Sequence, residues 1–424
     1  MNDYDETSRP VLCLSGGGFR ATLFHLGALK RLNELGVLGR LSVITSVSGG
    51  SILNGVLATR WSDLIRDANG VFGNFDELVA RPIRSFCGQD VRTRLLVGVR
   101  LNPANWGVLW RDFFSVPANF LSEAYHPLFQ RKQLSDLPAP GDGAPRFVFC
   151  ATSVQTGACW HFHGGPSGRM GDFYTGYTDT AGISVATAVA ASSAFPPGFG
   201  ALRLRIPTPE RLSRIDPLGK ERPPSLKRSD LPDGTKNLAI LTDGGVYDNL
   251  GVEPVWKRFK TMLVSDAGRP FASAPTSRQS LIPRLSRAFD ISAEQVGAVR
   301  RRWLVEEFSN DRRAGALWMI NTRLEDFPIN DGRGYTDSVR ALFPQVRTDL
   351  NAFSKGEAAC LENHGYSIAD AAIRSRAPQL CPLQNAAFDW PNGDWCDGAV
   401  ATRALARSHA RQVLPDVWRY IKRR

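Results

Sequence analysis

The sequence predicts an α/β protein. Two short apolar runs, Val11–Leu14 and Leu41–Ile44, each lead into a turn rich in glycine and then into an apolar pattern at helical spacing. Two later runs end instead at an aspartate, Asp243 and Asp266. Strands that alternate with helices are typical of α/β sheets, which place their chemistry at the carboxyl ends of the strands. We therefore expect the functional site where these four runs end.

The composition indicates a globular protein with an anionic partner. The chain has 424 residues, of which 43% are hydrophobic and 22% charged, so it has ample material for a core. Its formal net charge of +11 favours nucleic acid, a phospholipid surface or an anionic substrate. No compact run of lysine and arginine with interleaved aromatic residues indicates a nucleic-acid-binding module. We therefore expect no nucleic-acid partner.

The cysteines predict a cytoplasmic protein. Seven cysteines are scattered through the sequence without a C-x-x-C pair, which favours reduced thiols over disulfides or a zinc site. The stretch from Met1 to Arg9 is polar and acidic, unlike a secretory signal. No stretch of about 20 residues is apolar enough to span a bilayer.

The first apolar run leads into Ser15-Gly16-Gly17-Gly18-Phe19-Arg20 and then into a helical pattern. A strand, a glycine loop and a helix make an anion cradle, because backbone N–H groups converge there. One interpretation is an oxyanion hole. The other is a dinucleotide fingerprint, since Gly16, Gly18 and Ala21 fit G-x-G-x-x-A. That fingerprint needs an acidic residue after the next strand, and none occurs between Arg40 and Trp61, which weakens a nucleotide-binding oxidoreductase.

Two side chains close to this loop have open roles. Arg20 either orients the glycine loop or meets a substrate phosphate, and a solvent-facing position in the first helical turn is the alternative. His25 lies beside a leucine stripe, one turn from Leu29. A histidine in that position is expected to pack in the core rather than to act as a base.

The second apolar run ends in Ser46-Val47-Ser48-Gly49-Gly50-Ser51. A strand that turns into a helix across one serine predicts a nucleophile elbow, with the Ser48 hydroxyl exposed by the turn. Gly49 and Gly50 follow because larger side chains would collide with neighbouring backbone. Ser46 replaces the first glycine of the usual G-x-S-x-G pattern. Ser46 and Ser51 are rival nucleophiles that lack small neighbours on both sides.

The region from 61 to 140 is irregular and rich in aromatic residues and arginine. It fits either a cap packed over the core or a membrane–water interface, where apolar bodies enter the headgroup region and cations meet phosphates. The residues concerned are Arg92, Arg94, Leu95, Leu96, Arg100, Trp106, Leu109, Trp110, Arg111, Phe113, Phe114 and Phe120.

Strands are expected to resume from Arg146. His161 and His163 share one strand face, but no third ligand is nearby, so we expect no metal and no cofactor. A helix of small residues then runs into Ser192 and Ser193 and is ended by proline, and residues 204–236 are predicted to be a surface insertion.

The third apolar run leads into Asp243-Gly244-Gly245. Glycine lets the backbone approach and leaves the Asp243 carboxylate unshielded, although D-G-G alone also fits a plain turn. Asp266 is the second choice for a base. Asp248 is a fallback whose expected role is a turn with Asn249.

The C-terminal part is predicted to be mostly helical, with one strand at 317–321 and one helix over 348–365. Two basic stretches are candidate lipid contacts: Arg300-Arg301-Arg302-Trp303, for which a solvated face is the alternative, and Arg419–Arg424 at the end.

Four blocks together resemble the patatin-like phospholipase family. They are Ser15-Gly16-Gly17-Gly18-x-Arg20, the S-x-S-G-G elbow at 46–50, Ala191-Ser192-Ser193-Ala194-x-Pro196, and Asp243-Gly244-Gly245. The resemblance covers about residues 10 to 270; beyond it, Arg347-Thr348-Asp349-Leu350 and His364-Gly365-Tyr366 look like patches of bacterial members.

The resemblance implies a three-layer fold with a mainly parallel central sheet flanked by helices. It implies a catalytic domain over 8–275, with a cap at about 61–140, and a mostly helical region over 276–424 packed on the core. It also implies a dyad of Ser48 and Asp243 without a histidine base, and an oxyanion role for Gly16, Gly17 and Gly18; Arg20, Ser46, Gly49, Gly50, Gly244 and Gly245 support these motifs.

The implied activity is hydrolysis of glycerophospholipid acyl esters by a cytoplasmic protein that binds peripherally to an anionic phospholipid surface. A homo-oligomer is possible. The alternatives are a soluble carboxylesterase or thioesterase and an inactive lipid-binding regulatory protein.

Overall fold

The computed structural model describes residues 9–99, 116–141, 143–196, 198–206, 230, 237–271, 281–329, 333–409 and 416–418. Three stretches singled out in the sequence therefore lie wholly or partly outside the described residues: 100–115 of the expected cap, most of the expected insertion at 204–236, and the basic end at 419–424.

The centre of the molecule is a ten-stranded sheet. Its strands are β1 (Val11–Leu14), β2 (Val43–Val47), β4 (Arg146–Ser153), β5 (Cys159–His163), β6 (Arg169–Asp172), β7 (Gly176–Asp179), β9 (Leu202–Arg205), β10 (Leu238–Asp243), β11 (Thr261–Asp266) and β12 (Ala314–Met319). β12, β11, β1, β2 and β4 lie side by side and parallel, in that order. β5, β6 and β7 follow with antiparallel pairings, and β10 runs antiparallel to both β4 and β9.

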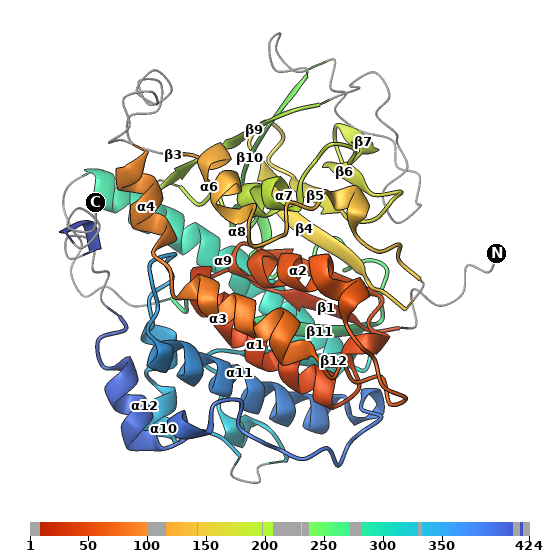
Figure 1. Cartoon of the computed structure of the whole chain (residues 1–424), viewed down its shortest axis with the longest axis vertical. Coiled ribbons are helices and arrows are strands. Elements are labelled where there is room, and N and C mark those ends of the chain that lie inside the picture. The colour runs from red at the N-terminus through yellow and green to blue at the C-terminus, as the bar shows by residue number, and fades with distance from the viewer. Residues whose placement is uncertain are drawn as a thin grey trace.

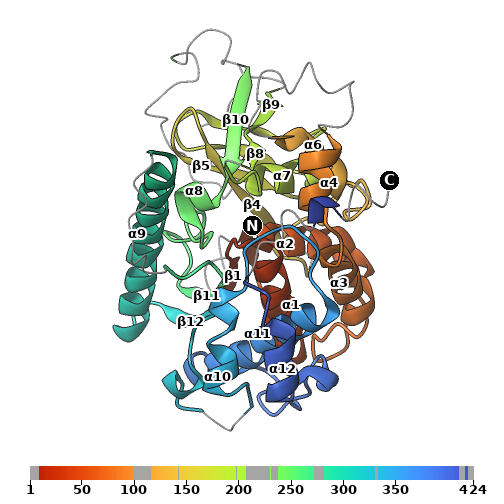
Figure 2. The same ribbon diagram turned by 90° about the vertical axis from the view of Figure 1, so that its left-hand side faces the viewer.

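The helices cover both faces of this sheet, so the mainly parallel, helix-flanked fold predicted from the sequence is confirmed. They are α1 (Gly18–Glu34), α2 (Gly49–Arg60), α3 (Arg81–Cys87), α4 (Val91–Gly98), α6 (Ala118–Tyr125), α7 (Val185–Ser192), α8 (Gly245–Asp248), α9 (Leu281–Ser309), α10 (Asp337–Arg340), α11 (Lys355–Arg376) and α12 (Gly398–Leu405). α1, α2, α3 and α11 lie together on one face of the sheet, and the long helix α9 lies on the other (Figures 1 and 2).

Alternation along the strands builds a core on each face. Leu12 and Leu14 of β1 belong to the larger core beneath α1 and α2, whereas Val11 and Cys13 belong to the smaller one, which also contains Leu304 of α9. Since both faces are buried, β1 is apolar throughout, as expected of a central parallel strand.

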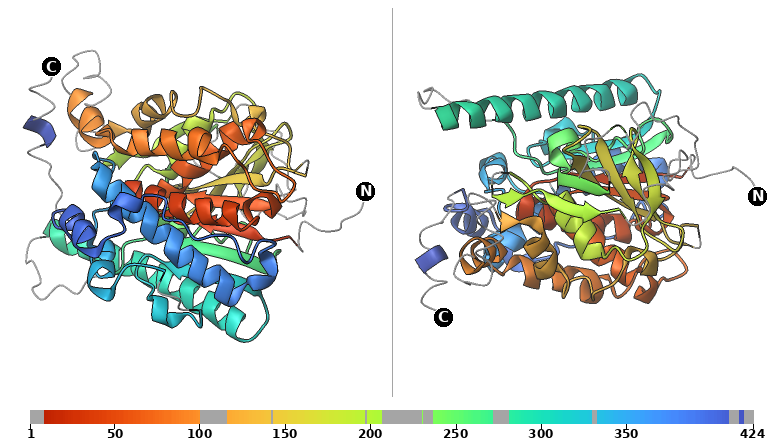
Figure 3. Two further views of the ribbon diagram at one scale, coloured as in Figure 1. Left: turned by 60° about the horizontal axis from the view of Figure 1, so that its bottom comes forward. Right: turned by 90° about the horizontal axis from the view of Figure 1, so that it is seen from above.

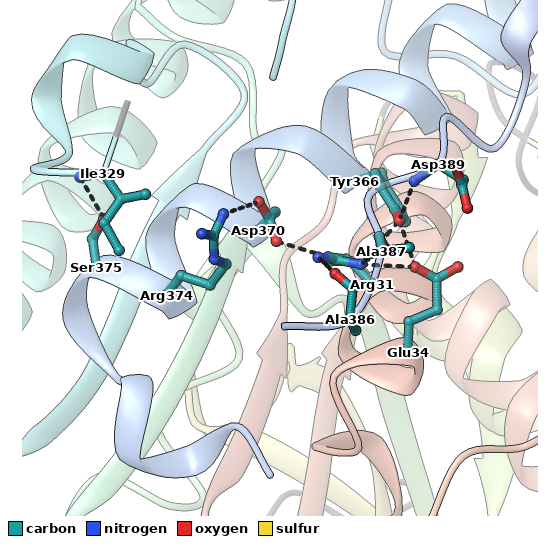
Figure 4. A network of polar contacts seen from close by, with 10 residues as sticks. All are labelled: Arg31, Glu34, Ile329, Tyr366, Asp370, Arg374, Ser375, Ala386, Ala387 and Asp389. Atoms are coloured by element: carbon teal, nitrogen blue, oxygen red, sulfur yellow. Dashed lines mark hydrogen bonds and ion pairs between the residues drawn. The ribbon is translucent and has the colours of Figure 1, made fainter. Parts of the chain in front are cut away.

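The C-terminal region is joined to the first helix by a buried cation. Arg31 of α1 donates to Asp370 of α11 at 2.7 Å, to the Tyr366 hydroxyl at 3.1 Å and to the Ala387 carbonyl at 2.7 Å (Figure 4). Because a buried guanidinium needs several acceptors, these contacts fix α11 against α1.

Two expected elements of the C-terminal region differ from the structure in their limits. The strand expected at 317–321 is β12, which begins three residues earlier, at Ala314, and joins the central sheet beside β11. The helix expected over 348–365 is α11, which begins only at Lys355, because Ser354 and Glu357 form a capping box there. Within the described ranges no helix is both long and apolar enough to cross a membrane.

Candidate active site

Ser48 lies at a sharp turn between β2 and α2. Its backbone has φ 50° and ψ −116°. Among the described non-glycine residues, Ser48 alone has a positive φ at a strand-to-helix junction. A side chain in this region is strained, and such strain is found where a nucleophile is held out from its strand. Ser48 is half-buried, whereas the two neighbouring serines at 46 and 51 are fully buried. The predicted elbow geometry is therefore present.

The rival serines support the turn. The Ser46 hydroxyl donates to the Val148 carbonyl at 3.1 Å and lies 3.0 Å from the hydroxyl of Ser51. Ser51 in turn lies 2.9 Å from the hydroxyl of Ser192. A glycine at position 46 would leave Ser51 without this partner, so serine there has a structural reason.

Ser192 has a role that its sequence block did not reveal. Its hydroxyl accepts the backbone N–H of Ser48 at 2.9 Å and donates to the Cys150 carbonyl at 2.6 Å. It therefore joins the elbow to β4. The signal was the motif at 191–196, but its spacing alone indicates only the end of a small-residue helix.

Asp243 lies at the carboxyl end of β10 with its side chain 2% exposed. Oδ1 accepts the N–H of Gly245 at 2.7 Å, while the backbone N–H of Asp243 donates to the Ala194 carbonyl at 3.1 Å. Oδ2 is buried and has no hydrogen-bond partner among the described residues. Burial raises the pKa of Asp243 to about 7, although the N–H of Gly245 and the Ser48 hydroxyl both lower it.

The structure thus brings the Ser48 hydroxyl and the Asp243 carboxyl together from different strands. The hydroxyl is close enough to influence the pKa of Asp243, yet no hydrogen bond of standard geometry joins the two side chains. Contacts of this kind commonly tighten only when substrate is bound. Oδ2, the oxygen without another partner, is the one available to accept a proton from Ser48.

The glycine loop lies beside the elbow, but its three amides are not equivalent. The N–H of Gly16 donates to the Asn249 carbonyl at 3.0 Å, so it is already used. No hydrogen bond engages the N–H groups of Gly17 and Gly18 within the described part of the chain. The expected set of three oxyanion donors is therefore narrowed to these two. The loop also approaches the elbow closely, because a Cβ on Gly49 would lie 2.1 Å from the Gly18 carbonyl oxygen.

Arg20 is fully buried and holds the segment at Ala267, which packs against Gly17 of the glycine loop. It donates to the carbonyls of Val346 at 2.7 Å and Ala267 at 2.8 Å, and to that of Pro344 at 3.2 Å. Burial lowers the pKa of Arg20 to about 9. Of the roles considered from the sequence, the structure fits the orientation of the loop; a solvent-facing position and a phosphate contact do not fit a side chain that is buried and already hydrogen-bonded.

Replacing Arg20 with methionine should lower the free energy of unfolding by about 2–4 kcal/mol, because two buried carbonyls and a half-buried one would lose a charged donor. Urea denaturation followed by circular dichroism measures this. Arg40 is the matched control, since it is exposed, and its replacement should change stability by less than about 0.5 kcal/mol. Equal losses in the two variants would show that the buried contacts of Arg20 do not stabilise the fold.

The other candidate residues have structural partners. His25 is buried between the Ser265 hydroxyl at 2.7 Å and the Ser15 carbonyl at 3.0 Å, as expected of a packing histidine. Asp248 accepts the N–H groups of Leu250 and Glu253 and lies 3.4 Å from Arg300. The expected turn with Asn249 is thus present, with Asn249 at its centre and the N–H of Leu250 as the donor.

The remaining candidates show no arrangement for a base or a metal. Asp266 accepts the N–H of Gly268 and pairs with Arg301 at 3.2 Å. His161 and His163 are neighbours on β5, with ring centroids 5.9 Å apart. Among the described residues, no group of three or more histidine, cysteine or acidic side chains could hold a metal ion.

Comparison with known proteins gives one family match. The model of a family described as patatin-like phospholipase matches residues 12–256. A search of curated protein sequences finds no significant match.

Several solved structures share low sequence identity with the chain. Human GIVD cytosolic phospholipase A2 is 12% identical with a TM-score of 0.36, and the match covers 62% of this chain and 46% of that protein. In complex with methyl gamma-linolenyl fluorophosphonate, the human protein is 15% identical, with a TM-score of 0.44 and coverages of 95% and 60%. VipD from Legionella pneumophila is 14% identical with a TM-score of 0.33, and the match covers 89% of this chain and 67% of VipD. The chain thus spans less than half the length of the first of these proteins.

Proposed function

The chain belongs to the patatin-like phospholipase family, whose model matches more than half of its residues, and we propose that it is a lipid acyl hydrolase that uses Ser48 and Asp243. The observation that carries the proposal is the Asp243 carboxyl, buried beside the Ser48 hydroxyl with one oxygen that has no other partner among the described residues. The family membership supports ester hydrolysis, and the arrangement of the two side chains supports a serine nucleophile.

The reaction proceeds in two steps. Asp243 Oδ2 takes the proton from the Ser48 hydroxyl while the Ser48 oxygen attacks the ester carbonyl carbon. The bond to the alcohol breaks, and Asp243 returns the proton to the leaving oxygen, which leaves an acyl group on Ser48. Water then attacks the acyl carbon while Asp243 takes its proton; the bond to the Ser48 oxygen breaks, Asp243 returns the proton to that oxygen, and the fatty acid leaves.

The negative oxygen that forms in each step is held by the N–H groups of Gly17 and Gly18. Both amides are unengaged within the described residues and belong to the loop against which the elbow packs. The positive end of the α1 dipole adds to this stabilisation. Loss of one such donor typically costs about 10²–10³ in rate.

Activity should depend on pH with an acid limb centred near pH 7. The base must be unprotonated, and burial raises the pKa of Asp243 to about 7, so kcat/KM should fall about tenfold per pH unit below that value. A solvent-exposed carboxyl would instead keep the rate constant down to about pH 4. A pH profile of monomeric-ester hydrolysis measures the midpoint, and a midpoint near 4 would contradict the role of buried Asp243 as base.

The proposed substrate is a glycerophospholipid or lysophospholipid in a membrane surface that carries anionic lipid, and the net charge of +11 supports the preference for anions. Lipid extracts analysed before and after incubation with the purified chain test this directly. Release of fatty acids from phospholipid supports the proposal. Turnover of short-chain esters alone would favour a carboxylesterase or thioesterase, and failure of a labelled fluorophosphonate to attach to Ser48 would favour an inactive lipid-binding protein.

A further inference from the structure

The helix α9 carries an exposed apolar stripe on a protein whose other long helices are buried. Leu285, Phe289, Val296 and Trp303 are 61%, 38%, 39% and 52% exposed. Their spacing places them along one side of the helix. α9 is the outermost helix on its face of the sheet, with the short helix α8 beneath it, as the views from the side and from above show (Figures 2 and 3). Packing in the core does not account for the exposed parts of these apolar side chains.

The stripe begins next to the candidate active site. The ring of Phe289 makes an edge contact with that of Phe195, with centroids 6.1 Å apart, and Phe195 is itself 49% exposed. Phe195 directly follows Ala194, whose carbonyl accepts the backbone N–H of Asp243. The exposed apolar surface therefore continues from α9 to the residue next to the one that holds Asp243.

Inner arginines fix the orientation of α9 on the body. Arg300 lies 3.4 Å from Asp248 and Arg301 lies 3.2 Å from Asp266, so two ion pairs join the helix to α8 and to the carboxyl end of β11. These pairs keep the stripe on the outside while holding α9 next to the site.

Exposed arginines lie on α9 and just before Phe271 in the chain. Arg269, Arg284 and Arg302 are exposed, and no ion pair engages them among the described residues. On the other side of α9, Phe271 is 44% exposed and lies under the Arg287 guanidinium at 4.1 Å from the ring centroid. Exposed aromatic and aliphatic side chains mixed with arginine suit the boundary between headgroups and acyl chains, where apolar groups are buried and cations meet phosphates.

We propose that this surface, formed by Phe195, Phe271, Leu285, Phe289 and the arginines at 269, 284 and 302, docks on a phospholipid bilayer with anionic headgroups. The inference rests on the proposed function, because a bilayer is the occupant that would also present the substrate. Docking through α9 brings Phe195, and with it the Asp243 strand end, to the plane of the membrane. The exposed arginines make an anionic surface the electrostatically complementary partner.

Vesicle flotation of the full-length protein tests this surface. All variants are made in a parent chain that carries Ser48→Ala, so that lipid hydrolysis does not interfere with the measurement of binding. Adding Leu285→Gln and Phe289→Gln should weaken binding to phosphatidylcholine–phosphatidylglycerol vesicles by about tenfold or more, because each apolar side chain would no longer be buried in the membrane. Adding Arg284→Glu and Arg302→Glu should remove the preference for phosphatidylglycerol. Both pairs lie on exposed helix positions, so circular dichroism should be unchanged.

Ile65→Gln is the matched control. Ile65 is 70% exposed. Its loop packs on Gly39, which precedes β2, whereas Ser48 follows β2, so Ile65 lies at the end of the sheet opposite Ser48. Its replacement should leave vesicle binding unchanged. Equal vesicle binding by the parent and the Leu285/Phe289 variant would overturn the inference. It would also be overturned if the parent binds no vesicles and sedimentation shows that it is a dimer which these substitutions dissociate.

The two proposals fail in different ways. If the Leu285/Phe289 variant loses vesicle binding while the unaltered chain hydrolyses no lipid, the surface is supported and the proposed function is not. If the unaltered chain hydrolyses vesicle lipid, and Leu285→Gln with Phe289→Gln in a chain that keeps Ser48 changes neither vesicle binding nor hydrolysis, the function is supported and the α9 surface is wrong.

Discussion

Replacing Ser48 with alanine should lower kcat for ester hydrolysis by about 10³-fold or more, since removal of a nucleophile generally leaves only the residual effect of oxyanion binding. The change removes only one hydroxyl from a half-buried side chain. The turn is held by the backbone N–H of residue 48, which donates to the Ser192 hydroxyl and is kept in the variant, so the fold should remain intact. Stopped assays with a monomeric ester and labelling with a fluorophosphonate measure the two consequences. Labelling that persists in this variant would identify a different nucleophile.

Replacing Asp243 with asparagine should cause a loss of similar size while raising stability above neutral pH. The amide oxygen can still accept the N–H of Gly245, and the amide nitrogen replaces an oxygen that has no hydrogen-bond partner among the described residues. The pKa of Asp243 in the folded chain, about 7, exceeds its ordinary value of 3.8. The folded state therefore binds this proton more tightly, and the stability that the carboxyl contributes at low pH is lost as pH rises through 7.

The sign of the stability change separates this residue from an ordinary buried carboxylate. Thermal unfolding at pH 8 should give a higher Tm for Asp243→Asn than for the unaltered chain. Asp248→Asn is the control, because Asp248 accepts two backbone N–H groups and lies near Arg300, so its Tm should fall. A lower Tm for both variants, with near-normal turnover, would refute the assigned role of Asp243.

The fold and the main candidate site were readable from the sequence because their signals are local. The strand, glycine loop and helix around Gly18 and the strand, serine and helix around Ser48 each lie within one short stretch. Asp243 could be chosen because it ends an apolar run before two glycines. The rule for parallel sheets brings the carboxyl ends of β1, β2 and β11 to one edge. It does not place Asp243, because β10 runs antiparallel to β4; Asp243 reaches this edge because it pairs with Ala151 near the carboxyl end of β4.

Contacts between segments that lie far apart in the chain could not be predicted from the sequence. The fully buried position of Arg20 depends on carbonyls more than 240 residues away in the chain. The use of the Gly16 amide depends on the carbonyl of Asn249, and the support of the Ser48 turn depends on Ser192. None of these pairings leaves a periodic or compositional trace, so each required the folded chain.

The exposed stripe of α9 was missed for a different reason. In the sequence, tryptophan and arginine between 61 and 140 give the stronger indication of a membrane interface, and on α9 only Arg300 to Trp303 forms a basic cluster. Whether an apolar residue is exposed depends on what packs on it, and spacing along the helix does not reveal this. Leu285 and Phe289 are ordinary core residues by pattern, and the structure leaves them exposed.

Replacing Gly18 with alanine should lower kcat by about 10²-fold or more by displacing an oxyanion donor. Gly18 has φ +58°, and an added Cβ would lie 2.7 Å from the carbonyl oxygen of Asp349, whose segment also accepts the N–H of Phe19. Relief of that contact must move either the loop or the segment at 349, and both support the amide of residue 18. KM for a monomeric ester should change little, because the donor acts mainly on the transition state.

Gly157→Ala distinguishes lost geometry from backbone strain. Gly157 has φ +68°, close to that of Gly18, but nothing lies within 4 Å of its added Cβ. Both variants therefore carry the left-handed penalty of about 1–2 kcal/mol, and only Gly18→Ala carries the collision. We expect similar losses of stability from strain in the two chains, an additional loss in Gly18→Ala, and a fall in kcat in that variant alone. An equal fall in kcat for Gly157→Ala would mean that general destabilisation, rather than displacement of the glycine loop, limits turnover.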